Sequence, residues 1–98
     1  MNGPDNPPLS GYPDAETIGL RIEEIEFEGL HIRMTMTRAI RIVQLWEMVD
    51  GQPVGWIGNV FRIDSEPPCI YLGHRYEAVL ARPERHALAR LAAKRWKF

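Results

Sequence analysis

The chain has 98 residues, 45% of them hydrophobic, which suits one domain with a single core and excludes a second domain. Its net charge of −1 excludes an overall field that would draw nucleic acid or membrane to the whole surface. The single cysteine excludes an intrachain disulfide and a cysteine-rich metal site, and it favours a reducing, cytoplasmic environment.

Charge is distributed unevenly along the chain. Residues 1–50 hold nine acidic and four basic side chains, a net of about −5, whereas residues 51–98 hold four and eight, a net of about +4. Two such halves can attract each other within one fold or between copies. Because the N-terminal segment lacks a basic stretch leading into an apolar run, and no apolar run reaches 18 residues, we expect neither secretion nor membrane insertion.

Residues 1–14 are predicted to be a flexible arm, and residues 15–98 a single α+β domain. Four of the eight prolines fall within the first thirteen residues, a composition that favours neither helix nor strand. An ordinary frayed terminus is the simpler interpretation. The alternative is a docking peptide anchored by Tyr12, because proline-rich segments lose little entropy on binding.

A first hairpin is predicted from the alternation of apolar and charged residues in EIEFE, residues 24–28, which resumes after Gly29 in LHIRMTMT. A tight turn at Glu28-Gly29 would match apolar with apolar residues and acids with bases across the strands: Phe27 with Leu30, Ile25 with Ile32, Glu26 with His31 and Glu24 with Arg33. A helix over residues 14–27 is the alternative, weakened by Gly19 in its interior.

A second hairpin is predicted around Asp50-Gly51, since both residues tolerate the positive φ of a tight turn. The strand before it would be too long if it ran straight from Leu30 to Met48, roughly 65 Å, so we expect a bend, bulge or break around Thr37 to Ala39. Residues 53–63 would return as the next strand.

Both faces of this second hairpin are apolar in sequence. One face would carry Trp46, Ile57, Phe61 and Ile63, and the other Leu45, Val54, Trp56 and Val60. One helix covers only one face of a sheet, so the second set is the candidate protein interface. Trp56 would be its anchor, because tryptophan often dominates binding energy. The alternative is a strongly bent sheet, or a partly closed barrel, that buries both sets within one chain.

The last third of the chain is predicted to contain a short strand in CIYL, a turn at Gly73-His74, a further strand in RYEAVLA and a helix over residues 82–98. The apolar side of the helix would carry Leu88, Leu91, Ala92, Trp96 and Phe98, and its basic face His86, Arg90, Lys94 and Lys97. The sequence therefore predicts a curved, mostly antiparallel sheet of four to five strands with one C-terminal helix packed on one face.

No catalytic, cofactor or metal site is predicted. The possible metal ligands lack the short spacings of zinc sites: His31, Cys69, His74 and His86. A lone cysteine in a strand is more often a small buried hydrophobe. The glutamates of the first hairpin alternate with core residues and so face water, and no nucleophile has a base beside it.

Two functions remain. The first is a non-enzymatic protein that binds a protein partner and self-associates, similar in style to the small accessory proteins of bacteria and their mobile elements. The alternative is a nucleic-acid-binding module that places the basic face of the helix on phosphates. Exposed aromatics that would stack on bases are not interleaved with these basic residues, since Trp96 and Phe98 fall on the apolar side.

Overall fold

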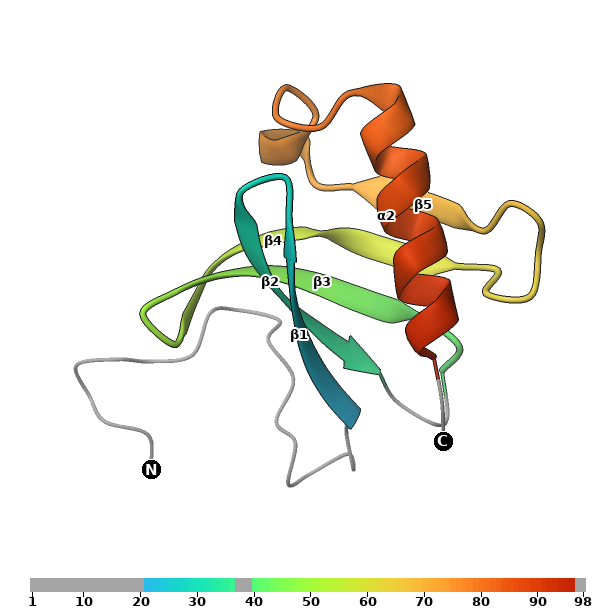
Figure 1. The fold of residues 1–98 in the computed structure, drawn as a ribbon, viewed down its shortest axis with the longest axis horizontal. Helices are drawn as coiled ribbons and strands as arrows, with labels where there is room; N and C mark the ends of the chain where they lie inside the picture. The colour runs from blue at the N-terminus through green and yellow to red at the C-terminus, as the bar shows by residue number, and fades with distance from the viewer. Residues whose placement is uncertain (1–20, 37–39, 97–98) are drawn as a thin grey trace.

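The computed structural model describes residues 21–36 and 40–96, which form a five-stranded sheet, a short 3-10 helix and one α-helix (Figure 1). The elements are β1 (Arg21–Phe27), β2 (Leu30–Met36), β3 (Val43–Val49), β4 (Gln52–Phe61), β5 (Cys69–Leu72), η1 (His74–Tyr76) and α2 (Arg82–Arg95). The predicted arm, residues 1–14, lies outside the described residues.

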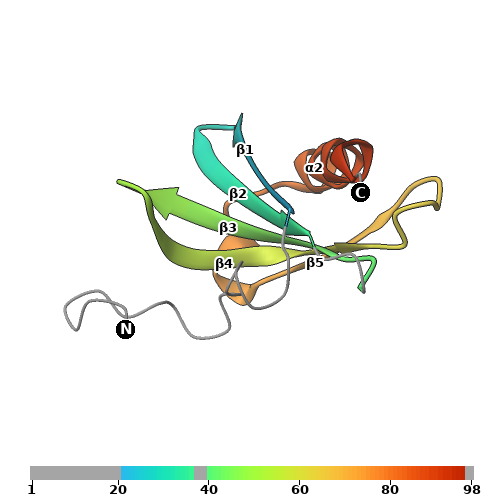
Figure 2. The same ribbon diagram turned by 90° about the horizontal axis from the view of Figure 1, so that it is seen from below.

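The strands follow one another in the sheet in chain order, and every neighbouring pair is antiparallel. The predicted α+β class, with a mostly antiparallel sheet and one C-terminal helix, is confirmed. The sheet does not close into a barrel, because β1 and β5 remain its two edges. The sheet is twisted, and α2 lies across one of its faces (Figure 2). We call this the inner face and the opposite one the outer face.

The β1–β2 hairpin has the predicted register in full, including all four predicted cross-strand pairs. Its turn is made by Glu28 and Gly29, which adopt φ values of 50° and 79°, as a tight turn of this hand requires. Residues 21–27 are therefore a strand, and the alternative of a helix reaching to residue 27 is wrong.

The β3–β4 hairpin turns at Asp50 and Gly51, with φ values of 53° and 77°, which confirms the predicted turn. The expected interruption of the preceding strand is also present, since β2 ends at Met36 and β3 begins at Val43. Its predicted position, Thr37 to Ala39, lies outside the described residues.

Two irregularities in the β3–β4 pairing change which side chains share a face. Leu45 lies opposite Gly58, but Trp46 lies opposite Trp56, so Ile57 is an extra residue in β4. A second shift follows between Glu47 and Met48. Such bulges bend and twist a strand and re-aim its side chains. The predicted faces are therefore wrong for Ile57 and Trp56. Ile57 lies in the core with Leu45 and Val60, whereas Trp56 pairs with Trp46 on the outer face.

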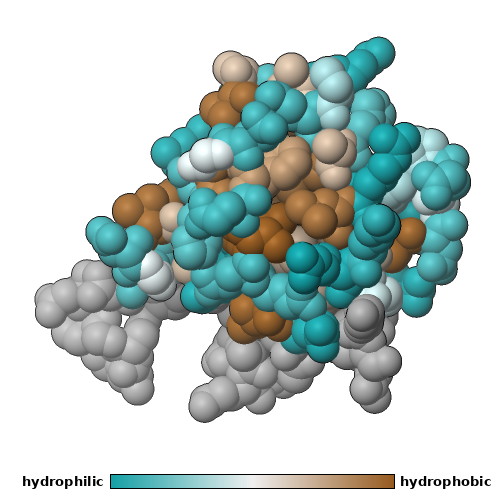
Figure 3. All heavy atoms as spheres, viewed as in Figure 1, coloured by the Kyte–Doolittle hydropathy of each residue, from teal (hydrophilic) through white to brown (hydrophobic). Residues whose placement is uncertain are grey.

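The core lies between the inner face and α2. Its fully or almost fully buried residues come from β2 to β5, η1, the following turn and α2: Ile32, Met34, Met36, Val43, Leu45, Ile57, Val60, Leu72, Tyr76, Leu80, Leu88, Ala89 and Ala92. On this side of the molecule hydrophobic residues remain visible between hydrophilic ones (Figure 3), and partly buried Ile25, Phe27 and Leu30 pack against the core. Of the predicted apolar side of the helix, Leu91 and Trp96 are half-buried, and Phe98 lies outside the described residues.

The segment RYEAVLA is not a strand, contrary to the prediction. After Gly73 the chain forms η1, and Tyr76 turns into the core, where it is 2% exposed. Its ring lies over Gly55, since a Cβ at that position would clash with the Tyr76 hydroxyl. The hydroxyl donates a hydrogen bond of 2.6 Å to Glu47 Oε1. Burial, together with the nearby carboxylate, raises the pKa of Tyr76 to about 12.

Candidate protein interface at the β5 edge

The structure separates the four residues predicted as a protein interface. Leu45 and Val60 are fully buried in the core beneath α2, so they are not available to a partner. Val54 is 38% exposed, and Trp56 is half-buried on the outer face. Only Val54 and Trp56 of the predicted set can contribute to a surface.

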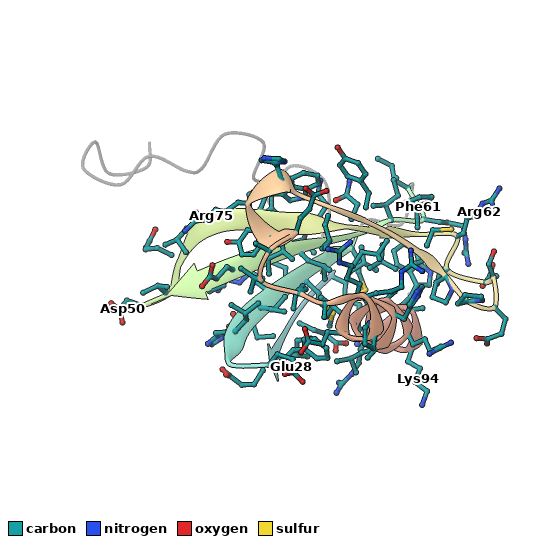
Figure 4. All side chains as sticks on the ribbon, turned by 90° about the horizontal axis from the view of Figure 1, so that it is seen from above. Glu28, Asp50, Phe61, Arg62, Arg75 and Lys94 are labelled. Atoms are coloured by element: carbon teal, nitrogen blue, oxygen red, sulfur yellow. The ribbon has the colours of Figure 1, made fainter. Side chains whose placement is uncertain are left out.

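Trp56 belongs to a cluster of aromatic side chains that the sequence did not single out. Its ring lies 6.0 Å from that of Tyr71, at an interplanar angle of 36°, and its Nε1 donates to Asn59 Oδ1 at 3.1 Å. Tyr71 lies opposite Asn59 in the ladder and is 63% exposed. Phe61, two residues after Asn59 in β4, lies on the side of the sheet away from α2 (Figure 4) and is 37% exposed. We call Trp56, Phe61 and Tyr71 the aromatic patch.

The aromatic patch borders an edge of the sheet, and the two edges differ in chemistry. In β1 four of seven residues are charged: Arg21, Glu23, Glu24 and Glu26. In β5, Cys69–Leu72, none of the four residues is charged. Charged side chains on an edge strand oppose pairing with another chain. Within the described part of the chain no strand pairs with the outer edge of β5. The backbone groups at this edge are therefore available for pairing, and β5 has no charged side chain that would oppose it.

Glu23, Glu24 and Glu26 of the β1–β2 hairpin contact basic residues of the same chain. Arg33 donates to Glu24 Oε2 from Nη2 at 2.7 Å and from Nε at 3.0 Å, and this guanidinium lowers the pKa of Glu24, with His31 acting in the same direction. Arg95 of α2 reaches Glu23 at 3.3 Å. The contact between Arg95 and Glu23 therefore joins the basic and acidic halves of the chain within one copy.

The predicted basic face of α2 is exposed. His86, Arg90 and Lys94 recur every four residues on the solvent side of the helix, and Figure 4 shows Lys94 pointing away from the sheet. Lys97 lies outside the described residues. Arg90 Nε lies 3.9 Å from Glu66 Oε1, and these two residues and Lys94 line a pocket of about 230 Å³ between α2 and the β4–β5 loop. A carboxylate thus lies at the middle of the basic face.

Residues of the types that bind metals are dispersed. Among residues 21–36 and 40–96 no group of three or more histidine, cysteine, aspartate and glutamate side chains is placed to hold a metal ion. Cys69 is a half-buried free thiol in β5, and His74 begins η1 with a fully exposed side chain 3.2 Å from Glu77. His31 lies between Glu24 and Glu26 on the outer face of the β1–β2 hairpin.

No helix in the described ranges is both long and apolar enough to cross a membrane. Comparison of the chain with protein-family models, with curated proteins and with solved structures found no match.

Proposed function

We propose that the chain is a non-enzymatic protein-binding module that self-associates through the β5 edge and the aromatic patch. The observation that carries the proposal is the coincidence of an uncharged edge strand with exposed aromatic side chains beside it. Unpaired strand edges bind extended chains through backbone hydrogen bonds, and flanking side chains supply specificity. Tyrosine and tryptophan are enriched where proteins bind one another.

The size of the surface supports a modest rather than an obligate interface. A four-residue strand is too small by itself to reach the roughly 800 Å² that each partner contributes to a standard stable interface. Tyr71 and Phe61 extend the apolar area on the outer face, and Trp56 stiffens it by its contact with Tyr71 and its bond to Asn59. We therefore expect reversible association in the micromolar range, about −8 kcal/mol.

The setting we propose for this activity is the cytoplasm of a bacterium, as an accessory protein of the cell or of a mobile element. The single free cysteine supports a reducing compartment.

Sedimentation equilibrium of the full chain over a wide concentration range tests the proposal. We expect a reversible dimer, and we expect Tyr71→Glu to weaken it by at least about tenfold, since the substitution places like charges at the edge. Val49→Glu, at a position that is 49% exposed at the far end of β3, is the matched control and should leave the association constant unchanged. A wild-type protein that stays monomeric would refute self-association.

Nucleic-acid binding is a second candidate, favoured by the exposed row of His86, Arg90 and Lys94 on α2. If phosphates bind there, affinity for mixed DNA and RNA should fall steeply with salt, and the double variant Arg90→Glu with Lys94→Glu should abolish it. Glu66 beside Arg90 opposes phosphate binding at that position, so we rank this candidate second.

A further inference from the structure

We propose that the partner of the β5 edge is a second copy of the chain, joined by antiparallel pairing of the two β5 strands with Tyr71 facing Tyr71 across a twofold axis. The inference rests on the proposed function, because it requires self-association, and it adds how the two β5 strands pair. The sheets of the two copies would become one ten-stranded sheet, with both copies of α2 on the same side.

The ladder between β4 and β5 determines which groups of β5 point outward. The amide of Gly73 donates to Ile57 O at 2.7 Å, directly beyond the last pair of the ladder. In an antiparallel ladder the hydrogen-bonded pairs recur every second residue, so Tyr71 and Cys69 bond inward to β4. The N–H and C=O groups of Ile70 and Leu72 therefore point away from β4, toward a chain that would add at this edge.

The side-chain faces restrict how two β5 strands can align. Residues directly opposite each other in an antiparallel pair lie on the same face of the sheet. Ile70, whose side chain is on the inner face, must therefore lie opposite another residue of the inner face. With the twofold axis at Cys69 or at Leu72, Ile70 would lie opposite Pro68 or His74, both outside β5. Two alignments with the axis at a central residue of β5 remain. In one, Tyr71 faces Tyr71 and Ile70 faces Leu72. In the other, Ile70 faces Ile70 and Leu72 faces Pro68.

The backbone groups favour the first alignment. With Tyr71 on the axis, Ile70 and Leu72 of each copy exchange both of their outward groups, which gives four hydrogen bonds and leaves none of these groups unpaired. With Ile70 on the axis, the carbonyl of Leu72 faces Pro68, which has no N–H to donate. The two tyrosines then form a pair without hydrogen bonds between their backbones, in which side chains approach most closely and aromatic pairs are favourable.

The charges at the two ends of β5 also fit a second copy in antiparallel orientation. The loop before β5 carries Asp64 and Glu66, which contact Arg41 at 2.6 Å and Arg90 at 3.9 Å in the same chain and whose side chains are still 83% and 88% exposed. The turn after β5 carries the exposed His74 and Arg75, with His74 lying 3.2 Å from Glu77. Antiparallel pairing brings the exposed carboxylates before each β5 beside His74 and Arg75 of the other copy, twice per dimer. A parallel arrangement would instead bring like charges together.

Disulfide trapping in the full chain tests this register. In a Cys69→Ser background, Tyr71→Cys would place two thiols at directly opposed positions, where the Cα separation of about 4.5 Å suits a disulfide. Phe61→Cys in the same background is the matched control, since it is exposed on the same face but one strand away from the axis. We expect the protein with cysteine at position 71 to form covalent dimers at least about tenfold faster under mild oxidation.

Because the cysteine substitution could itself weaken association, a second measurement uses the wild-type chain. Hydrogen exchange should show the amides of Ile70 and Leu72 becoming protected as protein concentration rises, whereas the amide of Tyr71, which bonds to β4, is protected at all concentrations. The protein could dimerise while the exchange rates of these two amides stay independent of concentration and position 71 cross-links no faster than position 61. That result would overturn the β5 register but not self-association. A wild-type chain that remains monomeric would overturn both.

Discussion

The two hairpins of the sheet are built in different ways. In β1–β2 the register runs without interruption, and acid–base pairs on the outer face and apolar pairs on the inner face accompany it. In β3–β4 two bulges interrupt the ladder, and side chains from distant segments occupy the space around β4, such as Tyr76 over Gly55. Cross-strand neighbours therefore specify the first hairpin, whereas contacts from β5 and η1 specify the second.

The strongest way to test this difference is to add a methyl group to a glycine of each hairpin. A Cβ at Gly58 would clash with the backbone carbonyl of Tyr71, which cannot move without parting β4 from β5. We expect Gly58→Ala to lower the free energy of unfolding by about 2–4 kcal/mol. Denaturant unfolding measures the change.

Gly29→Ala is the matched control in the first hairpin. A Cβ there would meet no atom within 4 Å, so the cost comes only from the positive φ of 79°. We expect a loss of about 1 kcal/mol. If Gly29→Ala cost as much as Gly58→Ala, the contrast between local and distant specification would not hold.

Removing the Tyr76 hydroxyl should have the next largest effect. Tyr76→Phe leaves Glu47 Oε1 without its donor at a half-buried site, which we expect to lower the free energy of unfolding by about 1–2 kcal/mol. The exposed Tyr71→Phe should change it by less than about 0.5 kcal/mol.

The same hydroxyl gives the second hairpin a response to alkaline pH. The pKa of Tyr76 is about 12 in the folded protein and about 10 when the chain unfolds, so its contribution to stability is fully present below pH 10 and is lost as pH rises through 12. Melting temperatures of wild type and Tyr76→Phe should converge over that range. A constant gap between them up to pH 12 would contradict the assignment.

The smallest effect is expected in the first hairpin, at Glu24. Arg33 lowers the pKa of this exposed carboxyl, so its contribution is present above about pH 4.3, the ordinary glutamate value, and is lost as pH falls through the lower folded pKa. Glu24→Gln should therefore lower the melting temperature slightly at pH 7, and the difference from wild type should shrink as pH falls below the ordinary glutamate pKa. If Glu24→Gln lowered the melting temperature at pH 7 more than Tyr76→Phe, the expected order of effects in the two hairpins would be wrong.

The same difference explains which parts of the fold the sequence predicts. The pairing of Ile25 with Ile32 and of Glu24 with Arg33 follows from alternation alone, because a hairpin with a tight turn has only one register that matches both. Ile57 could not be placed, because a bulge adds a residue without changing the composition of the strand. The segment after Gly73 is predicted to be a strand because it follows a turn, whereas in the structure Tyr76 packs over Gly55 of a strand that is distant in sequence.

The candidate interface could be predicted only in part. Trp56 was identified as an anchor, and it does lie on the face that α2 leaves uncovered. Leu45 and Val60 were grouped with it because the register was assumed to be regular. Tyr71 was missed, although alternation in CIYL places its side chain on the opposite face from Ile70 and Leu72. Its importance depends on β5 being an edge strand, and side-chain alternation does not determine the order of the strands.

The order of the strands also has a consequence for how the chain is made. Each strand pairs with its neighbour in sequence, so the sheet can form progressively as the polypeptide emerges from the ribosome. The residues that cover the inner face, Leu88, Ala89 and Ala92, are synthesised after all five strands. Until they emerge, a nascent sheet would present its apolar face to solvent, which is the stage at which chaperones would be most needed.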